Sequence, residues 1–196
     1  MFTPVFPSKI QGVADAYLRL LDKWNAVHSL TALPPDMRFE SLLLDSAALA
    51  PHLEPLSAGS LIADFGSGMG IPAVVIAAYR PDLCVAAIDR SHKKTAFVRQ
   101  AALELKLDNL RAICGPAESI TPLNAHFGTA KATGSLDLLL GWWNRHSIPG
   151  APFFAFKGPN WDVSEIKSDE WDCEIHPYRL PGLGERVIVK LVHNLR

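Results

Sequence analysis

The sequence predicts an α/β fold built on a central, mostly parallel sheet of seven strands. Short apolar segments alternate with helical segments up to residue 158, which is typical of parallel strands joined by right-handed crossovers. A glycine-rich segment, Asp64 to Pro72, joins the first apolar segment to a helical one. In parallel α/β sheets such a turn lies at the carboxyl end of a strand, where ligands bind.

Length and composition indicate one globular domain. The 196 residues are enough for a sizeable core, and we expect a helical N-terminal extension over 1–56 and an α/β core over 57–196. The net charge of −1 means that any contact with nucleic acid must come from a local patch. We expect a cytoplasmic protein, since no leader or membrane-spanning segment is recognisable. We also expect it to be a monomer.

Cysteine and histidine are scattered along the chain. The three cysteines, Cys84, Cys114 and Cys173, form no CxxC pair and fit reduced thiols in the interior. No Cys/His cluster has the spacing of metal ligands. We therefore expect no metal site.

The extension is predicted to contain two helices. Residues 11–28 place apolar side chains at three- and four-residue spacing, which is the pattern of an amphipathic helix. Pro34 and Pro35 interrupt this pattern, and residues 40–50 resume it. We expect these helices to cap the sheet.

The first strand, from Leu61, ends at Asp64, and Gly66, Gly68 and Gly70 follow it at alternate positions. Glycines here let the backbone turn sharply and approach a ligand closely. Pro72 suits the start of the helix predicted over 73–79.

The second strand, Leu83 to Ile88, ends at Asp89, roughly 20 residues beyond the glycines, where nucleotide folds place a carboxylate against ribose hydroxyls. The glycine spacing is not GxGxxG, and no GxxxxGK[ST] segment is present. The pattern favours S-adenosylmethionine (SAM), which carries no phosphate. An ordinary glycine-rich turn is the alternative.

The remaining elements complete the alternation. Helices are predicted over 91–106 and from residue 136 through 143, ending near Arg145 and His146, and strands over 110–114, 125–131 and 153–156. Two late strands at 171–178 and 185–192 should pair antiparallel at one edge. Lys93 and Lys94 lie in the first helical turn of 91–106, where cations oppose the helix dipole. This lysine pair either binds an anionic partner or forms a solvated basic face. Trp142 and Trp143 are neighbours and cannot both face the core, so we expect one of the two to pack there.

Several segments, in order, resemble one family, the bacterial small-subunit ribosomal RNA guanine-N7 methyltransferases, historically called glucose-inhibited division protein B. The similar segments are KWN from Lys23, LTA from Leu30, LLDS from Leu43, DFGSGMGIP from Asp64, KKTAFVR from Lys93, AE at Ala117, TAKA from Thr129 and FKG from Phe156.

The resemblance implies a Rossmann-like class I SAM-dependent methyltransferase fold with a helical N-terminal extension, acting on ribosomal RNA or the small ribosomal subunit. Guanine N7 carries an in-plane lone pair, so no general base is expected and catalysis rests on alignment. Predicted cofactor contacts are Asp64, Gly66, Ser67, Gly68, Gly70, Ile71, Asp89, Arg90, Ala117, Glu118 and Lys131.

By resemblance, Gly66 and Ile71 line the methionine and ribose end, Asp89 and Arg90 lie by the ribose, and Ala117 and Glu118 flank the adenine. Predicted contacts to RNA are Lys93, Lys94, Lys131 and Lys157. Asp45 either braces the extension or acts chemically.

The chain departs from the family pattern at several polar positions. Where the family has Arg-His before LLDS, this chain has Ser41–Leu42, and where the family motif RAE begins with arginine, this chain has Pro116. The family's acid at the start of the fourth strand is His126 here, and the arginine of its TARA motif is Lys131. Lysine keeps the charge but loses the planar fork. Two alternatives therefore stay open: a paralogue with a small-molecule or other RNA substrate, and a non-catalytic binding module.

Overall fold

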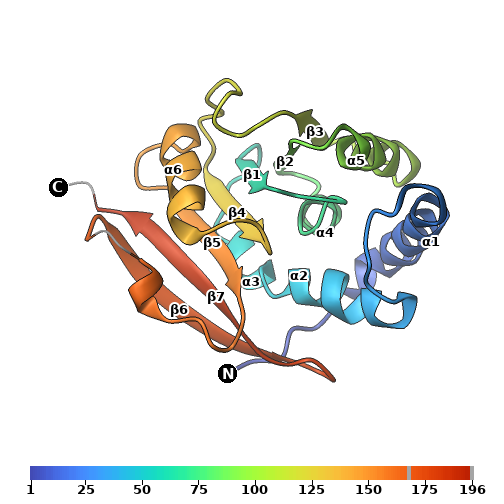
Figure 1. Cartoon of the computed structure of the whole chain (residues 1–196), viewed down its shortest axis with the longest axis horizontal. Coiled ribbons are helices and arrows are strands. Elements are labelled where there is room, and N and C mark those ends of the chain that lie inside the picture. Colours follow the sequence, from blue (N-terminus) through green and yellow to red (C-terminus); the bar gives the residue numbers. More distant parts are fainter. Residues whose placement is uncertain (167–168, 195–196) are drawn as a thin grey trace.

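A computed structural model describes residues 1–166 and 169–194. It contains a seven-stranded sheet in the order β3-β2-β1-β4-β5-β7-β6. β1 to β5 run parallel, and β7 lies antiparallel between β5 and β6, as the sequence predicts (Figure 1). The strands are β1 (Leu61–Phe65), β2 (Cys84–Asp89), β3 (Leu110–Cys114), β4 (Phe127–Lys131), β5 (Pro152–Lys157), β6 (Trp171–Leu180) and β7 (Gly184–His193).

Helical elements surround this sheet. The longer ones are α1 (Gln11–His28), α4 (Ala73–Tyr79), α5 (His92–Glu104) and α6 (Leu136–His146). Shorter ones are α2 (Asp45–Ala47), α3 (Ala50–Leu53), the 3-10 turns η1 (Ser8–Ile10), η2 (Pro35–Met37) and η4 (Val163–Glu165), and the π-helical segment η3 (Phe39–Leu44).

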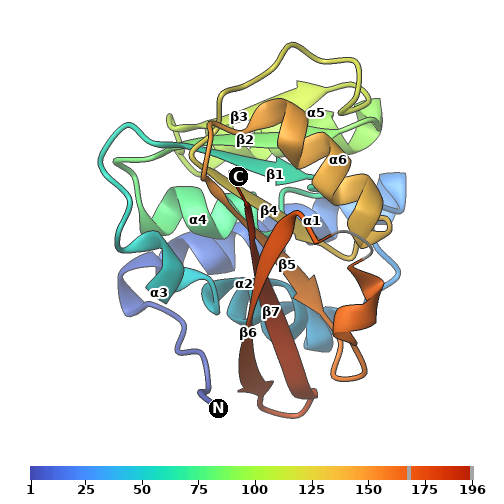
Figure 2. The ribbon, with the colours of Figure 1, turned by 90° about the vertical axis from the view of Figure 1, so that its left-hand side faces the viewer.

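The two faces of the sheet carry separate apolar cores, because side chains alternate along each strand. On β1, Ile62 points into one core, while Ala63 and Phe65 point into the other. The first core also contains side chains of α1, α4 and α5, and the second contains those of α6. Figures 1 and 2 show α4 and α6 on opposite sides of the sheet.

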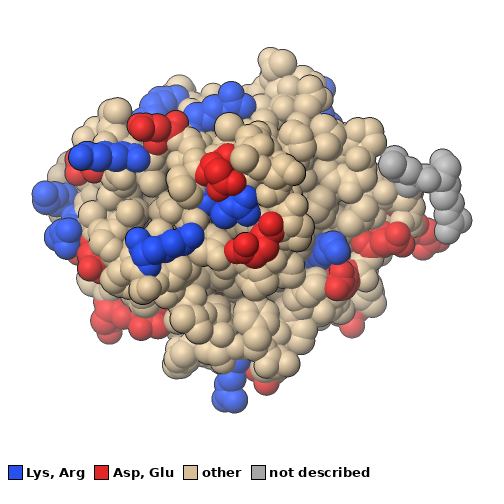
Figure 3. Space-filling model, turned by 180° about the vertical axis from the view of Figure 1, so that it is seen from behind, with Lys and Arg blue, Asp and Glu red and all other residues tan. Residues whose placement is uncertain are grey.

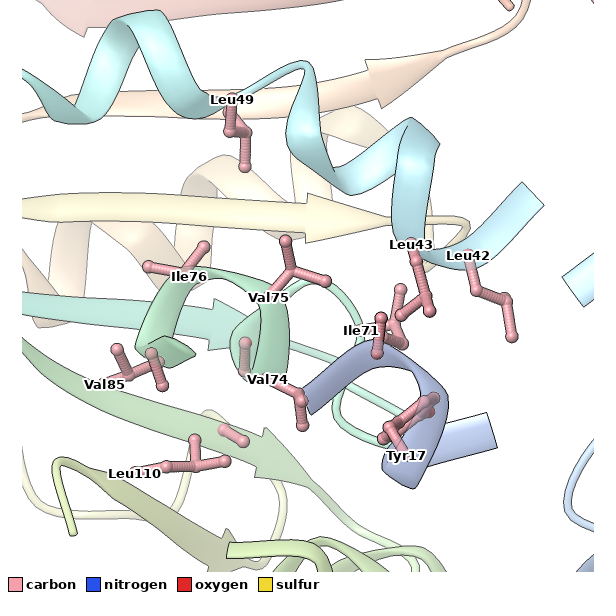
Figure 4. Close-up of a cluster of buried hydrophobic side chains, with 14 of the residues drawn as sticks. Tyr17, Leu42, Leu43, Leu49, Ile71, Val74, Val75, Ile76, Val85 and Leu110 are labelled. Atoms are coloured by element: carbon pink, nitrogen blue, oxygen red, sulfur yellow. The ribbon is translucent and has the colours of Figure 1, made fainter. Parts of the chain in front are cut away.

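The N-terminal helices belong to the first core. Figure 4 shows α4 between the extension and the sheet, with Val74 and Val75 among side chains such as Tyr17, Leu43 and Val85. The hydroxyl of Tyr17 also donates to the carbonyl oxygen of Met69 at 3.0 Å. The extension is thus packed against the glycine-rich turn.

The predicted helix over 40–50 is not continuous. The π-helical segment η3 comes first, α2 follows, and α3 extends to Leu53. The hydroxyl of Ser46 donates to the carbonyl oxygen of Leu42 inside this region. Spacing of apolar residues cannot separate these helix types, because each keeps one face toward the core. Other predicted elements differ from the structure only at their ends; β5, for example, is one residue longer at each end than the predicted strand over 153–156. The predicted end of α6 near Arg145 and His146 is confirmed.

The β6 edge of the sheet meets the N-terminus. Phe2 forms a parallel bridge with Tyr178, and the amide of Arg179 donates to the carbonyl oxygen of Phe2 at 2.9 Å. The Phe2 and Tyr178 rings stack, with centroids 5.8 Å apart. This contact covers the last part of β6.

Candidate cofactor and substrate site

A cavity of about 630 Å³ lies where the carboxyl ends of β1 to β4 meet. That volume is within the usual range for small-molecule sites. Its walls come from the glycine-rich turn, the ends of β2 and β4, the segment after β3, helix α6 and the extension. The lining includes Leu30, Leu42, Gly66, Ser67, Gly68, Met69, Ile71, Asp89, Arg90, Lys94, Pro116, Ala117, Glu118, Lys131, Thr133, Leu138 and Trp142.

The glycines of the turn adopt backbone conformations that side chains rarely tolerate. Gly66, Gly68 and Gly70 have φ angles of +64°, +58° and +85°. A Cβ on Gly68 would meet only a backbone oxygen at 4.0 Å, so its surface is open to a ligand. A Cβ on Gly66 would lie 2.2 Å from Cγ2 of Thr133, so the absent side chain makes room for Thr133.

Gly70 is a predicted cofactor residue that does not line the cavity. A Cβ there would lie 3.1 Å from Val74 and from Val98. Its missing side chain therefore lets the turn pack closely on α4 and α5, and the residue acts on the packing of the turn.

Asp89 joins the glycine-rich turn to the end of β2. Its Oδ2 accepts a hydrogen bond from the Gly68 amide at 2.9 Å, and its Oδ1 accepts one from the Ser91 amide at 2.8 Å. The residue is 8% exposed and lines the cavity. Each carboxylate oxygen has further acceptor capacity, so both can still receive hydroxyl donors.

Asp64, a predicted cofactor contact, lies beneath the turn and outside the lining. It is fully buried, and its Oδ2 accepts a hydrogen bond from the Ala73 amide at 3.2 Å. Its Oδ1 has no hydrogen-bond partner among the described residues. Burial raises the pKa of this carboxyl well above its usual value. The position holds the turn onto the start of α4.

Two residues of the cavity wall, Thr133 and Leu138, belong to none of the sequence motifs that predict the site. Thr133 fills the space beside Gly66, and its hydroxyl donates to the Gly66 carbonyl oxygen at 3.1 Å. Leu138 is 47% exposed at the cavity wall. Trp142 faces the cavity and Trp143 is 1% exposed in the core, which confirms that one of the two tryptophans packs inside.

Lys131 links the cavity to the N-terminal extension. Its Nζ lies 2.6 Å from Oδ2 of Asp45 and also donates to the carbonyl oxygen of Ser41. Tyr178 donates its hydroxyl to Oδ1 of Asp45 at 2.5 Å. Burial lowers the pKa of Lys131, and the Asp45 charge opposes that shift. Asp45 therefore braces the extension against β4 and β6.

The other predicted RNA-binding lysines divide between the cavity and the surface. Lys94 lines the cavity. Lys93 donates to the carbonyl oxygen of His28, and Lys157 pairs with Glu165 at 2.9 Å, and neither residue lines the cavity.

The departures from the family pattern occupy different places. Leu42 and Pro116 line the cavity, whereas Ser41 presents its backbone oxygen to Lys131. Nδ1 of His126 accepts from the Leu61 amide at 3.1 Å. Because Leu61 and His126 lie at the amino ends of β1 and β4, that departure is at the opposite end of the sheet.

Positive and negative side chains are mixed on the molecular surface. Figure 3 shows Lys and Arg side chains interspersed with Asp and Glu over the face seen from behind. Among residues 1–166 and 169–194, no group of three or more His, Cys, Asp or Glu side chains could hold a metal ion. In the same residues, no helix is long and apolar enough to cross a membrane.

A glycine turn hydrogen-bonded to a strand-end carboxylate, beside an open cavity at the carboxyl ends of parallel strands, is the arrangement expected of a SAM-dependent methyltransferase. Solved structures share the fold. An O-methyltransferase from Bacillus cereus in complex with SAH superposes with a TM-score of 0.63 at 15% identity, covering 96% of this chain and 98% of that one. A SAM-dependent methyltransferase from Aquifex aeolicus gives 0.57 at 14% identity, covering 80% and 93%.

Sequence comparisons identify the family. The chain belongs to the GidB family, whose model is described as rRNA small subunit methyltransferase G and matches residues 11–187. Proteins named ribosomal RNA small subunit methyltransferase G are similar: that of Neisseria meningitidis serogroup C is 36% identical over 90% of this chain and 86% of its own length. The Methylobacillus flagellatus protein is 47% identical over 59% of this chain and 55% of its own length.

Proposed function

We propose that the cavity binds SAM and that the enzyme transfers its methyl group to N7 of a guanine in small-subunit ribosomal RNA. SAM supplies an electrophilic methyl group on a sulfonium. The observation that carries the proposal is the hydrogen bond from the Gly68 amide to Asp89, which places a carboxylate and an open glycine surface on one cavity wall.

The cofactor contacts follow from this arrangement. Asp89 accepts the ribose hydroxyls with its remaining lone pairs, and Arg90 lies beside it. Gly66, Ser67, Gly68 and Ile71 receive the amino-acid end, where a bare backbone leaves room. Ala117 and Glu118 flank the adenine. The fit is supported by the open surface at Gly68 and by a cavity volume suited to a small molecule.

The target base would lie on the side of the cavity lined by Lys131. An ammonium group has three N–H donors, and Asp45 and Ser41 receive two of them. The third is available for an acceptor in the cavity, such as the guanine O6 next to N7. Because N7 has an in-plane lone pair, the residues need only align the base with the methyl group, and no proton has to be removed first.

The RNA must present the guanine unstacked. Lys94 at the cavity and Lys93 beside it supply positive charge for phosphates. Lys157, the last residue of β5, supplies a further positive charge next to β4. Trp142 and Leu138 offer an apolar wall. Since no metal is required for this displacement, none is part of the proposal.

The proposal includes a monomer that works in the cytoplasm, where ribosomal RNA is made into subunits. It also treats the chain as one domain, because residues 1–56 share the first apolar core with the sheet of residues 57–196. Assays with naked small-subunit RNA and with assembled small subunits distinguish these two substrates.

The test combines binding with methyl transfer. Calorimetry should show SAH binding, and radiolabelled SAM should label small-subunit RNA or subunits isolated from cells that lack the gene. Chemical cleavage at N7-methylguanosine then maps the site. RNA affinity measured over a salt series should fall steeply, because phosphate contacts release counterions. Absence of SAH binding overturns the cofactor assignment; binding with no label in ribosomal RNA overturns the substrate.

A second candidate is the same reaction on a different substrate, which Leu42 favours. This side chain stands at a polar position of the family pattern and lines the cavity. A small or less charged substrate would suit this apolar wall. Label incorporated from SAM into cell extract depleted of RNA would support it.

A further inference from the structure

The connection between β3 and β4 forms a cavity wall without a helix of its own. Among the described residues, 115–126 contain neither helix nor strand. Gly115, Pro116, Ala117 and Glu118 at its start all line the cavity. A wall of this kind must be held in place by contacts from elsewhere, because a loop lacks the packing of a regular element.

His146, the last residue of α6, contacts both ends of this connection. Its backbone carbonyl oxygen accepts from the Ala125 amide at 2.7 Å. Its side-chain Nε2 lies 2.8 Å from the carbonyl oxygen of Ala117. The residue is 0% exposed, and its ring lies 5.6 Å from that of Phe65 on β1. One residue therefore ties the start and the end of the connection to the helix.

The hydrogen bond to Ala117 determines the state of the imidazole. A carbonyl oxygen can only accept, so Nε2 carries the proton. Nδ1 is buried and has no hydrogen-bond partner in the part of the chain that the structure describes. The ring is thus neutral, held by Phe65 on one side and by the Ala117 carbonyl at its donor.

We propose that His146 is a positioning residue for the cofactor: through Ala117 it sets the wall against which the adenine ring lies. The proposal rests on the proposed function, which places the adenine at Ala117 and Glu118. His146 itself does not line the cavity and takes no part in the methyl transfer.

The experiment compares two amide variants of similar polarity. In His146→Gln the side-chain amide nitrogen reaches about as far as Nε2 and can donate to Ala117. In His146→Asn it reaches only about as far as Nδ1 and cannot. Asn144→Ala, at an exposed position of the same helix, is the matched control. Each protein is studied by thermal unfolding, amide hydrogen exchange without ligand, SAH calorimetry and steady-state kinetics.

His146→Asn should speed amide exchange across 115–126 while leaving the turn at 66–70 unchanged. It should raise the SAH dissociation constant and the KM for SAM by about tenfold, the effect of losing one buried hydrogen bond, with kcat at saturating SAM unchanged. His146→Gln should restore both within about threefold. A role in stability alone would lower the melting temperature without this KM shift.

Equal exchange and equal SAH affinity in His146→Asn and the unaltered protein would overturn the proposal, as would a fall in kcat at constant KM. Because exchange is measured without ligand, it tests the link between His146 and the connection even if the protein binds no SAH. Failure of SAH binding in the unaltered protein instead counts against the proposed function.

Discussion

At the scale of single residues, Gly66 is the most constrained position of the site. Its φ of +64° and the closeness of Thr133 both exclude a side chain. We expect Gly66→Ala to abolish measurable SAH binding and to lower the melting temperature, because the added Cβ must displace Thr133 or the turn.

Gly12 provides the control for that change. It lies in α1, and a Cβ there meets nothing within 4 Å. Gly12→Ala should stabilise the protein by about 0.5–1 kcal/mol, the helix-propensity difference, and leave SAH binding intact. Normal SAH binding by Gly66→Ala would contradict the assignment of the turn to the cofactor.

Asp89 accepts a hydrogen bond from the glycine-rich turn and, in our proposal, also from the ribose hydroxyls. Removing the carboxylate in Asp89→Ala deprives the Gly68 and Ser91 amides of their acceptor. Hydrogen bonds to charged groups contribute about 1.5–3 kcal/mol, so SAH affinity should fall at least about tenfold by calorimetry.

Asp82 is the matched control for Asp89. It precedes β2 at the opposite end of the strand and pairs with Arg80 at the surface. Asp82→Ala should leave SAH affinity unchanged. Similar affinity losses in both variants would mean that net charge, and not ribose contact, causes the effect.

At the scale of elements, the buried pair of Lys131 and Asp45 joins the extension to β4. The side chains are 14% and 7% exposed. Breaking a buried pair leaves one charge without compensation and costs about 3–5 kcal/mol. Asp45→Ala should therefore lower the free energy of unfolding by about that amount in urea denaturation.

A double-mutant cycle with Lys131→Met isolates the pair. The double variant should be more stable than Asp45→Ala alone, because no charge is then left buried. The exposed Lys190–Glu174 pair is the control and should contribute less than about 1 kcal/mol. Additive effects of the two changes would show that the pair does not couple extension and sheet.

The elements differ in how far the sequence predicts them. The alternation of strands and helices and the antiparallel pairing of the two late strands follow from local sequence patterns. The strand order does not, because it depends on which strands meet in the fold. The binding turn and Asp89 are also local signals. The contacts of Lys131 and His146 are not local signals. Only the fold brings Asp45, held by Tyr178, to Lys131, and Ala117 to His146. The π-helical segment η3 escaped prediction since its apolar spacing matches an α-helix.

At the scale of the whole molecule, stability should fall in acid. His52 lies between Phe154 and His176, with Lys190 and Glu174 nearby. Burial, with the charges of His176 and Lys190, lowers the pKa of His52 to about 4. The unfolded chain, with a pKa near 6.5, then binds more protons between these two values.

The stability that neutral His52 contributes is thus complete above about pH 6.5 and is lost as the pH falls toward about 4. Urea denaturation across this range should show it, and His52→Gln should flatten the dependence. His193→Gln, at the end of β7, is the control. An unchanged pH profile in His52→Gln would assign the acid sensitivity elsewhere.

The contact between Phe2 and the end of β6 affects how the protein behaves in solution. A long exposed edge strand can pair with a strand of another chain, which is the first step toward fibrous aggregates. Here Phe2 already pairs with the end of β6, and Pro177 offers no N–H to a neighbouring strand. The carboxylate of Asp172 adds a negative charge to the same strand, which disfavours pairing with an identical strand. Concentrated protein should therefore remain monodisperse in light scattering, and deletion of residues 1 and 2, which removes Phe2, should increase aggregation.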